Sequence, residues 1–451
     1  MRHTEISPDR VHETLRRHLL VDGYPIVVDL EHSRRSWVKD RITGKDYLDF
    51  FSFFASNPIG FNHPSMLDDD IQERLARVAT TKVSNADYYT VYMAEFVDTL
   101  EKTAAPPEFP HYFFIDGGAL AVENGMKAAF DWKAKKNRAA GRTAPGSQIL
   151  HLERAFHGRS GYTLSVTNTD PVKTDHFPKF DWPRIPSPAI RFPLQDHLDA
   201  VVELEQAALA AAERAFEERR HDIAAILVEP IQGEGGDNHF RPEFFAELRR
   251  LADEHEALLI YDEVQTGLGL TGRWWAYEHQ SVAPDIICFA KKMQVGGILV
   301  NRRIDEVPNN VFAQSSRINS TWGASLVDMV RCTKILEIIV NERLLENAAS
   351  RGLELLQGLQ TLEGDYPDLV GNARGSGLMC AVDLPTTEFR NRILRACFDD
   401  GMIVLPCGPR SVRFRPTLTV QADAIAEGIL RFRRALEHVL TASRKSSAVG
   451  G

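Results

Sequence analysis

The sequence predicts an α/β protein with a mostly parallel sheet flanked by helices, followed by a smaller α+β domain. Of its 451 residues, 43% are hydrophobic and 25% are charged, which is ordinary for a globular chain with a large core. This length suggests two or three domains. From about residue 70 to 330, apolar strand-like segments alternate with amphipathic helices, a pattern typical of βαβ units and a parallel sheet.

The elements before and within this alternating region are expected as follows. A helix from Pro8 to about Leu20 precedes strand-like segments at 25–30 and 36–51, the second with a turn at Thr43-Gly44. The expected strands of the sheet are 111–116, 148–153, 223–230, 257–264 and 285–290, and the expected helices include 121–136 and 198–220. Such sheets bind ligands outside the carboxyl ends of their strands, so the residues that follow each strand are the candidates for chemistry.

Two later regions differ from this pattern. Six prolines between Pro171 and Pro193 exclude a regular element there. A long insert of this kind is either functional or a surface excursion, and its own residues favour neither. From about residue 331, a helix, a strand pair around 378–384 and 402–406, the segment 412–416 and a last helix predict the smaller α+β domain.

Composition excludes several classes of protein. The formal net charge of −9 argues against a nucleic-acid-binding protein, which normally has a basic face. The five cysteines show no C-x-x-C spacing, so neither a zinc site nor a disulfide framework is expected, and a reducing cytoplasm fits. The first residues lack the apolar core of a signal peptide, and no segment has the apolar length of a membrane span.

The turn after the strand at 111–116 is the first candidate site. Gly117, Gly118 and Ala119 stand where a helix begins, and the free N–H groups and dipole of a helix N-terminus favour a phosphate. Their small side chains let a ligand approach the backbone. Taken alone, a tight strand–helix turn without a ligand explains the Gly pair better.

The strand at 257–264 ends on two acids, Asp262 and Glu263. Alternation along a strand directs these two carboxylates to opposite faces, so that one can enter a site while the other supports it. Strand-end charges that reach solvent are an alternative. A metal cluster with the residues at 253–256 is a further one, which we disfavour because DEHE is typical of the polar end of a helix.

Other strand ends carry an aromatic ring and arginines. Phe156, His157 and Arg159 follow the strand at 148–153, where an aromatic ring can stack on a planar ligand and an arginine can hold a carboxylate bidentately. Arg413 and Arg415 share one face of the segment 412–416. Each residue alone is equally compatible with core packing or a solvated surface.

The strand at 285–290 ends on two lysines, Lys291 and Lys292, and lysine is uncommon at a buried strand end. Together, a phosphate-binding turn, an aromatic ring, an acid and a lysine at successive strand ends are the set that pyridoxal phosphate requires. The acid keeps the pyridine nitrogen protonated, and the lysine forms the Schiff base. The sequence therefore predicts a pyridoxal-phosphate enzyme.

Three segments also carry a family resemblance. LIYDEVQTGLGLTG (259–272) resembles the signature of class III (ω-type) aminotransferases, and GGALAVENGMKAAF and EPIQGEGG resemble further segments of that family in the same order. Additional segments, among them AFHGRSGYTLS, FPKFDWPRI, NSTWG and VRFRP, are more narrowly similar to bacterial L-lysine 6-aminotransferases. The resemblance covers nearly the whole chain. It also places the Pro-rich insert near the mouth of the active site.

The resemblance implies fold type I, in which a large domain has a mostly parallel seven-stranded sheet. It divides this chain into a small-domain segment at 1–69, a large cofactor-binding domain at 70–330 and a small domain at 331–451. It also implies roles for individual residues. The implied cofactor-binding residues are Gly118, Ala119, Phe156, Asp262, Gln265, Lys291 and Thr321, with Thr321 reaching the cofactor of the other subunit in an obligate homodimer.

The resemblance implies transfer of the ε-amino group of L-lysine to 2-oxoglutarate, giving 2-aminoadipate 6-semialdehyde and L-glutamate by a ping-pong mechanism. Ornithine or 4-aminobutyrate is the alternative amino donor. The implied substrate-binding residues are Arg159, Glu234, Gln265, Asn319 and Arg413, with Glu234 pairing with Arg413 when lysine is bound and leaving it for the dicarboxylate.

This sequence departs from the family pattern in two places. Many members have Gly-Lys, three residues and Gly-Gly. Counting back from Gly296-Gly297 selects Lys292, whereas the small residue before the lysine, Ala290 here, selects Lys291. We expect Lys291, with Lys292 pointing the opposite way. The other departure is TWGAS after Asn319, where the small residues near the cofactor phosphate differ.

Overall fold

A seven-stranded sheet lies at the centre of the larger part of the protein, in a computed structural model that describes residues 5–449. β9 pairs antiparallel with its neighbours β3 and β8, and the remaining pairs are parallel. The strands, in their order across the sheet, are β3 (His111–Ile115), β9 (Gly296–Val300), β8 (Ile286–Phe289), β7 (Leu258–Asp262), β6 (Ile223–Val228), β4 (Gln148–Leu152) and β5 (Arg184–Ile185). The mostly parallel sheet and all five expected strands are confirmed.

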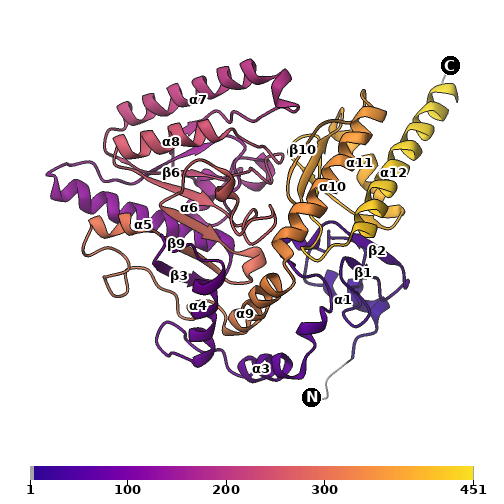
Figure 1. Cartoon of the computed structure of the whole chain (residues 1–451), viewed down its shortest axis with the longest axis horizontal. Coiled ribbons are helices and arrows are strands. Elements are labelled where there is room, and N and C mark those ends of the chain that lie inside the picture. The colour runs from indigo at the N-terminus through magenta and orange to yellow at the C-terminus, as the bar shows by residue number, and fades with distance from the viewer. Residues whose placement is uncertain (1–4, 450–451) are drawn as a thin grey trace.

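Helices cover both faces of this sheet (Figure 1). Side chains alternate along β7: Ile260 packs in the cluster that contains Met126 of α5 (Gly118–Ala139), whereas Tyr261 packs with Phe245 of α8 (Pro242–Glu254). α7 (Leu198–Glu218) lies beside α8. Because both faces are buried, the strands are continuous apolar runs in the sequence.

The smaller part contains a four-stranded antiparallel sheet covered by helices. In order, its strands are β10 (Gly371–Ser376), β11 (Met379–Asp383), β14 (Ser411–Phe414) and β13 (Leu405–Cys407), and its helices are α10 (Leu344–Asp365), α11 (Thr387–Asp399) and α12 (Ala422–Val449). Strands form at both expected places, 378–384 and 402–406, but they do not pair with each other, because β14 lies between β11 and β13. Strand order in an antiparallel sheet depends on distant pairing that local sequence does not specify.

The N-terminal segment joins this smaller part (Figure 1). β1 (Trp37–Lys39) and β2 (Asp46–Asp49) form the expected hairpin, and β12 (Met402–Ile403) adds to β2 in parallel. The expected helix at Pro8 is shorter than predicted, with η1 at Pro8–Arg10 and α1 at Val11–Arg16. The segment 25–30 forms only an isolated bridge, between Val28 and Asp40.

The two parts are linked by α9 (Leu326–Asn341), which contacts α3 (Asp69–Ala79) and α4 (Val91–Thr103) and runs on to α10. The expected boundary between residues 330 and 331 falls inside this helix, and the division remains a prediction. The other short helices are η2 (Pro64–Met66), α6 (Gly161–Val166), η3 (Pro171–Lys173), η4 (Leu194–Asp196), η5 (Ala276–His279), η6 (Lys291–Met293) and η7 (Arg302–Glu306).

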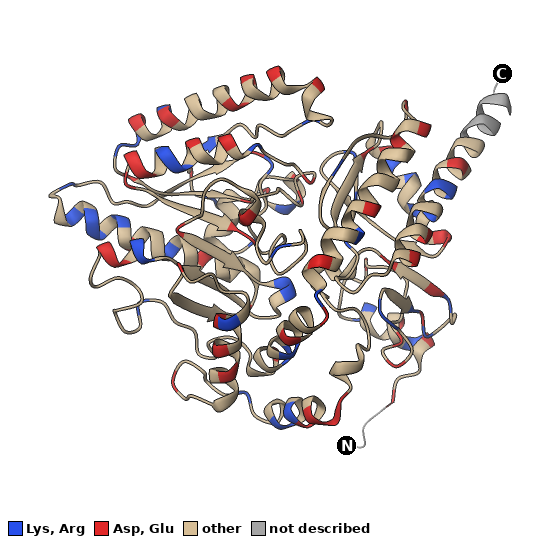
Figure 2. Cartoon of the chain, viewed as in Figure 1, with Lys and Arg blue, Asp and Glu red and all other residues tan. Residues whose placement is uncertain are grey.

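Charged residues lie mainly along the outer helices, where the two signs are interspersed, whereas the strands of the central sheet are largely uncharged (Figure 2). Within residues 5–449, no helix combines the length and apolar character needed to cross a membrane.

Candidate active site

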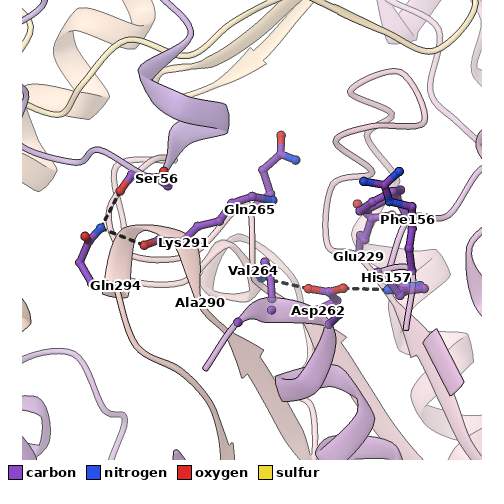
Figure 3. A pocket seen from close by; sticks show the side chains of 15 residues that line it. Ser56, Phe156, His157, Glu229, Asp262, Val264, Gln265, Ala290, Lys291 and Gln294 are labelled. Atoms are coloured by element: carbon purple, nitrogen blue, oxygen red, sulfur yellow. Dashed lines mark hydrogen bonds and ion pairs between the residues drawn. The ribbon is translucent and has the colours of Figure 1, made fainter. Parts of the chain in front are cut away.

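A cavity of about 490 Å³ lies where β6, β7 and β8 end and α5 begins. Its size is in the range of small-molecule sites. Lys291 extends into it from one side, Phe156, His157 and Glu229 lie at the other, and Asp262 lies between them (Figure 3). Of the expected site residues, those that line it are Gly118, Ala119, Phe156, Arg159, Asp262, Gln265 and Lys291.

The glycine turn before α5 is closely packed against two other site segments. Gly117 has φ +90°, a conformation that favours glycine. A Cβ on Gly118 would lie 2.8 Å from Val264 Cγ1, and one on Gly158 would lie 2.6 Å from the Ala119 Cβ. These close approaches hold the N-terminus of a 22-residue helix at the cavity wall, where N–H groups without intrahelical partners can bind an anion.

The Asp262 carboxylate is held in place by two donors. Its Oδ1 accepts the Val264 N–H at 3.0 Å, and its Oδ2 lies 2.8 Å from His157 Nδ1. His157 is buried, and its Nε2 has no hydrogen-bond partner among the described residues. An ionised Asp262 fixes the Nδ1–H tautomer of this histidine. The arrangement fixes the orientation of the carboxylate at the cavity.

Two further carboxylates at the site are buried: Glu229 lines the cavity, and Glu263 lies behind its lining. Glu263 accepts the N–H groups of Ala276 and Tyr277 at 3.0 and 2.8 Å, and burial raises its pKa to about 7. Glu229 accepts the Phe156 N–H at 3.0 Å, and burial raises its pKa to about 7 as well. Asp262 lines the cavity and Glu263 does not, so the two carboxylates point to opposite sides, as alternation along the strand predicts.

The two lysines have different surroundings. Lys291 lines the cavity, and its amine has no hydrogen-bond partner among the described residues. Burial lowers its pKa from the ordinary value. Lys292 points away, and its ammonium donates to the carbonyls of Gln265 at 2.6 Å and Ala55 at 3.3 Å. The two lysines point in different directions, as expected. The cause is a turn of the chain in η6, and not the alternation of an extended strand that was expected.

The segment that receives Lys292 has an unusual backbone. Ser52, Phe53, Phe54 and Ala55 have φ between +40° and +60°, which makes α2 (Ser52–Ala55) a left-handed turn. Such a conformation costs about 1–2 kcal/mol per residue for L-amino acids. The buried Asp49 carboxylate offsets part of this cost by accepting the N–H of Ser52 at 2.9 Å.

Within this turn, the Ser52 hydroxyl donates to the Arg415 carbonyl at 2.6 Å. Gln294 donates to the Ser56 carbonyl at 2.7 Å and also to the carbonyl of Lys291 (Figure 3). Lys292, through the Ala55 carbonyl, and Gln294, through the Ser56 carbonyl, therefore both bind the N-terminal segment 52–56.

A group of charged side chains lies beside the cavity. Arg413 Nη2 is 2.7 Å from Glu234 Oε2, and Arg413 Nη1 is 3.4 Å from the Gln265 Oε1. Arg415 also reaches Gln265 Oε1 and forms a fully buried ion pair with Asp237 at 2.5 Å. The two arginines share one face of their strand, as predicted. Arg413 is 2% exposed, so its paired acid is its main source of charge compensation.

The Pro-rich insert reaches this group. Apart from η3 and β5 its backbone is irregular, as expected. Lys173 Nζ lies 2.5 Å from Glu234 Oε1 and 5.4 Å from the centre of the Phe156 ring. The insert therefore contributes a side chain to the surroundings of the cavity.

Asn319 and Thr321 lie outside this cavity, in the loop before α9. The Thr321 carbonyl accepts the Ser84 hydroxyl, and Lys82 lies 3.7 Å from the ring centre of Trp322. Trp322 is 46% exposed, although it is large and aromatic. The loop thus presents apolar and polar groups away from the site of its own chain.

The alternative metal cluster is wrong. Asp253 pairs with Arg249 and Arg303 at the other end of β7 from Asp262. Among the described residues, the group that could hold a metal ion is Asp29, Glu31 and His32, which lies elsewhere.

The cavity fits pyridoxal phosphate on its own geometry. A buried amine of lowered pKa, a fixed carboxylate, an aromatic ring and an open helix N-terminus surround one space. An enzyme with such a site on this sheet is a pyridoxal-phosphate-dependent enzyme of fold type I.

Comparison with known proteins shows which family of pyridoxal-phosphate-dependent enzymes the chain belongs to. Residues 21–436 match the model of the family described as aminotransferase class-III. An L-lysine-epsilon aminotransferase of Mycobacterium bovis is 54% identical, over 95% of this chain and 96% of its own. The mitochondrial 4-aminobutyrate aminotransferase of Homo sapiens is 31% identical, over 92% of this chain and 86% of its own.

A solved structure of lysine aminotransferase from Mycobacterium tuberculosis matches with a TM-score of 0.94 and 54% identity, covering 96% of this chain and all of that one. The chain belongs to the class-III aminotransferase family. It is therefore an aminotransferase whose cofactor is pyridoxal 5'-phosphate.

Sequence reasoning assigned no role to several residues at the cavity. His157 stands directly after Phe156, and its pairing with Asp262 joins β4 to β7 across the sheet, 105 residues apart. Ser56 and Gln294 meet through a hydrogen bond 238 residues apart in sequence. The strand-end rule placed His157 among the candidates without giving it a role, but nothing local marks Ser56.

Proposed function

We propose that the protein transfers the ε-amino group of L-lysine to 2-oxoglutarate, giving 2-aminoadipate 6-semialdehyde and L-glutamate in two half-reactions. The carrying observation is the ion pair of Arg413 with Glu234 beside the cavity, at 2.7 Å. A site that takes a cationic amine and then a dicarboxylate needs an arginine whose charge can be masked. The name of the relative at 54% identity supports this choice of substrates.

In this proposal, the cofactor supplies an electron sink for the bond broken at the substrate carbon that carries the amine. Lys291 would be its covalent anchor, and Asp262 would keep its ring nitrogen protonated. Phe156 would stack on the ring, and Gln265 would contact the ring oxygen. Gly118 and Ala119 would bind the phosphate at the start of α5.

Lys291 is also the group that moves the proton. Burial lowers the pKa of its amine, so a larger fraction is neutral and able to act as a base. No hydrogen bond from another described residue competes for this amine. With substrate bound at the cofactor, the Lys291 amine would be free to accept the proton from the ε-carbon and to donate it again within the same site.

The substrate carboxylates are assigned to two arginines. Arg413 binds the α-carboxylate of 2-oxoglutarate or glutamate after Glu234 has moved away. Arg159 takes the γ-carboxylate of these molecules, or the α-carboxylate of lysine. Asn319 lies outside the cavity of its own chain, so its expected part in shaping the pocket requires a partner subunit.

We further propose an obligate homodimer with shared active sites. Thr321 lies outside the cavity of its own chain, and the exposed Trp322, Tyr88 and Tyr89 lie on or near the same loop. Exposed aromatic residues of this kind are typical of an interface. Thr321 would then reach the phosphate in the partner. A cytoplasmic location is supported by five free, buried cysteines.

The test is a comparison of initial rates of the purified holoenzyme with lysine, ornithine and 4-aminobutyrate, each with 2-oxoglutarate. We expect lysine to give the largest kcat/KM. A larger value with 4-aminobutyrate or ornithine would contradict the proposed substrate and leave the enzyme class intact.

A further inference from the structure

Lys173 is a charged residue near the cavity that the proposed reaction does not use. It comes from η3 in the Pro-rich insert, and it pairs with Glu234 Oε1 at 2.5 Å. Arg413 binds the other oxygen of the same carboxylate at 2.7 Å. Glu234 therefore lies between two cations, one from each part of the molecule.

The burial of the three groups differs. Arg413 is 2% exposed, whereas the side chains of Glu234 and Lys173 are 25% and 21% exposed. Burial alone would raise the pKa of Glu234, but Arg413 and then Lys173 hold this pKa below its ordinary value. The carboxylate is thus ionised, and leaving it unpaired in a mostly buried position would be costly.

Charge counting shows what the second cation does. The three groups sum to one positive charge. When Glu234 leaves Arg413 for a substrate carboxylate, it loses one of its two partners and must keep the other. The added carboxylate then completes two pairs, Arg413 with substrate and Glu234 with Lys173, and neither Glu234 nor Arg413 is left alone.

We propose that Lys173 is a specificity-determining residue that retains Glu234 when Arg413 binds a dicarboxylate. This inference rests on the proposed function, because it assumes that Arg413 receives the substrate carboxylate. Removing Lys173 leaves Arg413 as the main partner of Glu234. The Arg413–Glu234 pair is then favoured. This weakens the binding of the dicarboxylate and leaves the reaction with lysine unchanged.

The test uses holoenzymes of the wild type, Lys173→Met and Lys173→Arg. Lys179→Met is the matched control, because Lys179 lies in the same insert, is exposed, and has no polar partner among the described residues. Calorimetry measures binding of glutarate, an unreactive dicarboxylate of the same length as 2-oxoglutarate. Single-turnover measurements give the lysine half-reaction, and thermal unfolding checks that each variant folds.

We expect Lys173→Met to weaken glutarate binding about 3- to 10-fold, the range for a partly exposed charge-assisted hydrogen bond. The rate of the lysine half-reaction should change less than about twofold, because the Arg413–Glu234 pair stays closed. Lys173→Arg should restore most of the affinity, and Lys179→Met should leave it unchanged.

Three results would overturn the inference: unchanged glutarate affinity in Lys173→Met, an equal loss in both measurements, or an equal loss in Lys179→Met. The last would mean general attraction of anions by the insert. A wild type that binds glutarate but does not react with lysine would contradict the proposed function alone, and the glutarate series would still decide the role of Lys173.

Discussion

The two sides of the cavity are built differently. On the cofactor side, Asp262 ends β7 and Lys291 follows the adjacent strand β8, and Asp262 is fixed by hydrogen bonds at 3.0 and 2.8 Å. On the substrate side, Glu234, Lys173 and Arg413 come from a loop, an irregular insert and the smaller part, and two of them are partly exposed. The cofactor side, which we call the rigid side, suits one chemistry, whereas the substrate side serves two substrates in the proposed function with groups from three separate segments.

The largest expected effect is on the rigid side, at the two lysines. Lys291→Ala should abolish turnover, and borohydride reduction of the wild-type holoenzyme followed by peptide mapping should give a pyridoxyl adduct on Lys291. Lys292→Met should keep that adduct but lose about 1–3 kcal/mol of unfolding free energy, because a buried and a partly buried carbonyl lose their donor. An adduct on Lys292 would reverse the two assignments.

The next largest effect is expected at Asp262. Asp262→Asn retains the shape and a hydrogen bond to His157, but it cannot keep the ring nitrogen protonated. We expect kcat to fall about 10²–10³-fold, as when one fixed electrostatic group is removed from an active site. The control is His157→Gln, which leaves the carboxylate charged and should cost less. Equal losses would show that orientation, and not charge, dominates on this side.

On the substrate side, substitutions should have smaller effects, which differ between the two half-reactions. Glu234→Gln removes the counter-charge of Arg413, so the KM for lysine should rise about 10-fold, an estimate for a lost charged hydrogen bond. The 2-oxoglutarate half-reaction should be unchanged or improved. Separate single-turnover measurements of each half-reaction check this, and two unchanged half-reactions would rule out the exchange of partners.

The smallest effect concerns support behind the rigid side. The pKa of Glu263 is about 7 in the folded protein against an ordinary value of 4.5, so the folded state binds more protons between these pH values. Stability should fall as pH rises through this window, by at most about 3 kcal/mol. Glu263→Gln should reduce the difference in unfolding temperature between pH 5 and 8, relative to wild type. If the variant showed the same difference in unfolding temperature as the wild type, Glu263 would not be the source of the pH dependence.

Local sequence predicted the residues of the rigid side better than those of the substrate side. Asp262, Lys291 and Gly118 each follow an apolar strand, so the rule that ligands bind at carboxyl ends located them. The choice between Lys291 and Lys292 depended on one turn of backbone, which a residue count cannot resolve.

Distant pairing was beyond this kind of reasoning. The position of β14 between β11 and β13, the contact of His157 with Asp262 and the left-handed turn at Ser52–Ala55 all depend on residues far apart in the chain. The role of Lys173 was hidden for the same reason: its insert has no periodicity, and only the fold brings it to Glu234.

The left-handed turn has a consequence for the order in which the protein assembles. It is held by the Arg415 carbonyl, 363 residues later, and its Ala55 carbonyl receives Lys292, 237 residues later. At synthesis rates of about 5–20 residues per second, roughly 20–70 seconds separate emergence of Ser52 from that of Arg415. Until then the turn lacks a stabilising contact, so the nascent chain completes its active centre only near the end of translation.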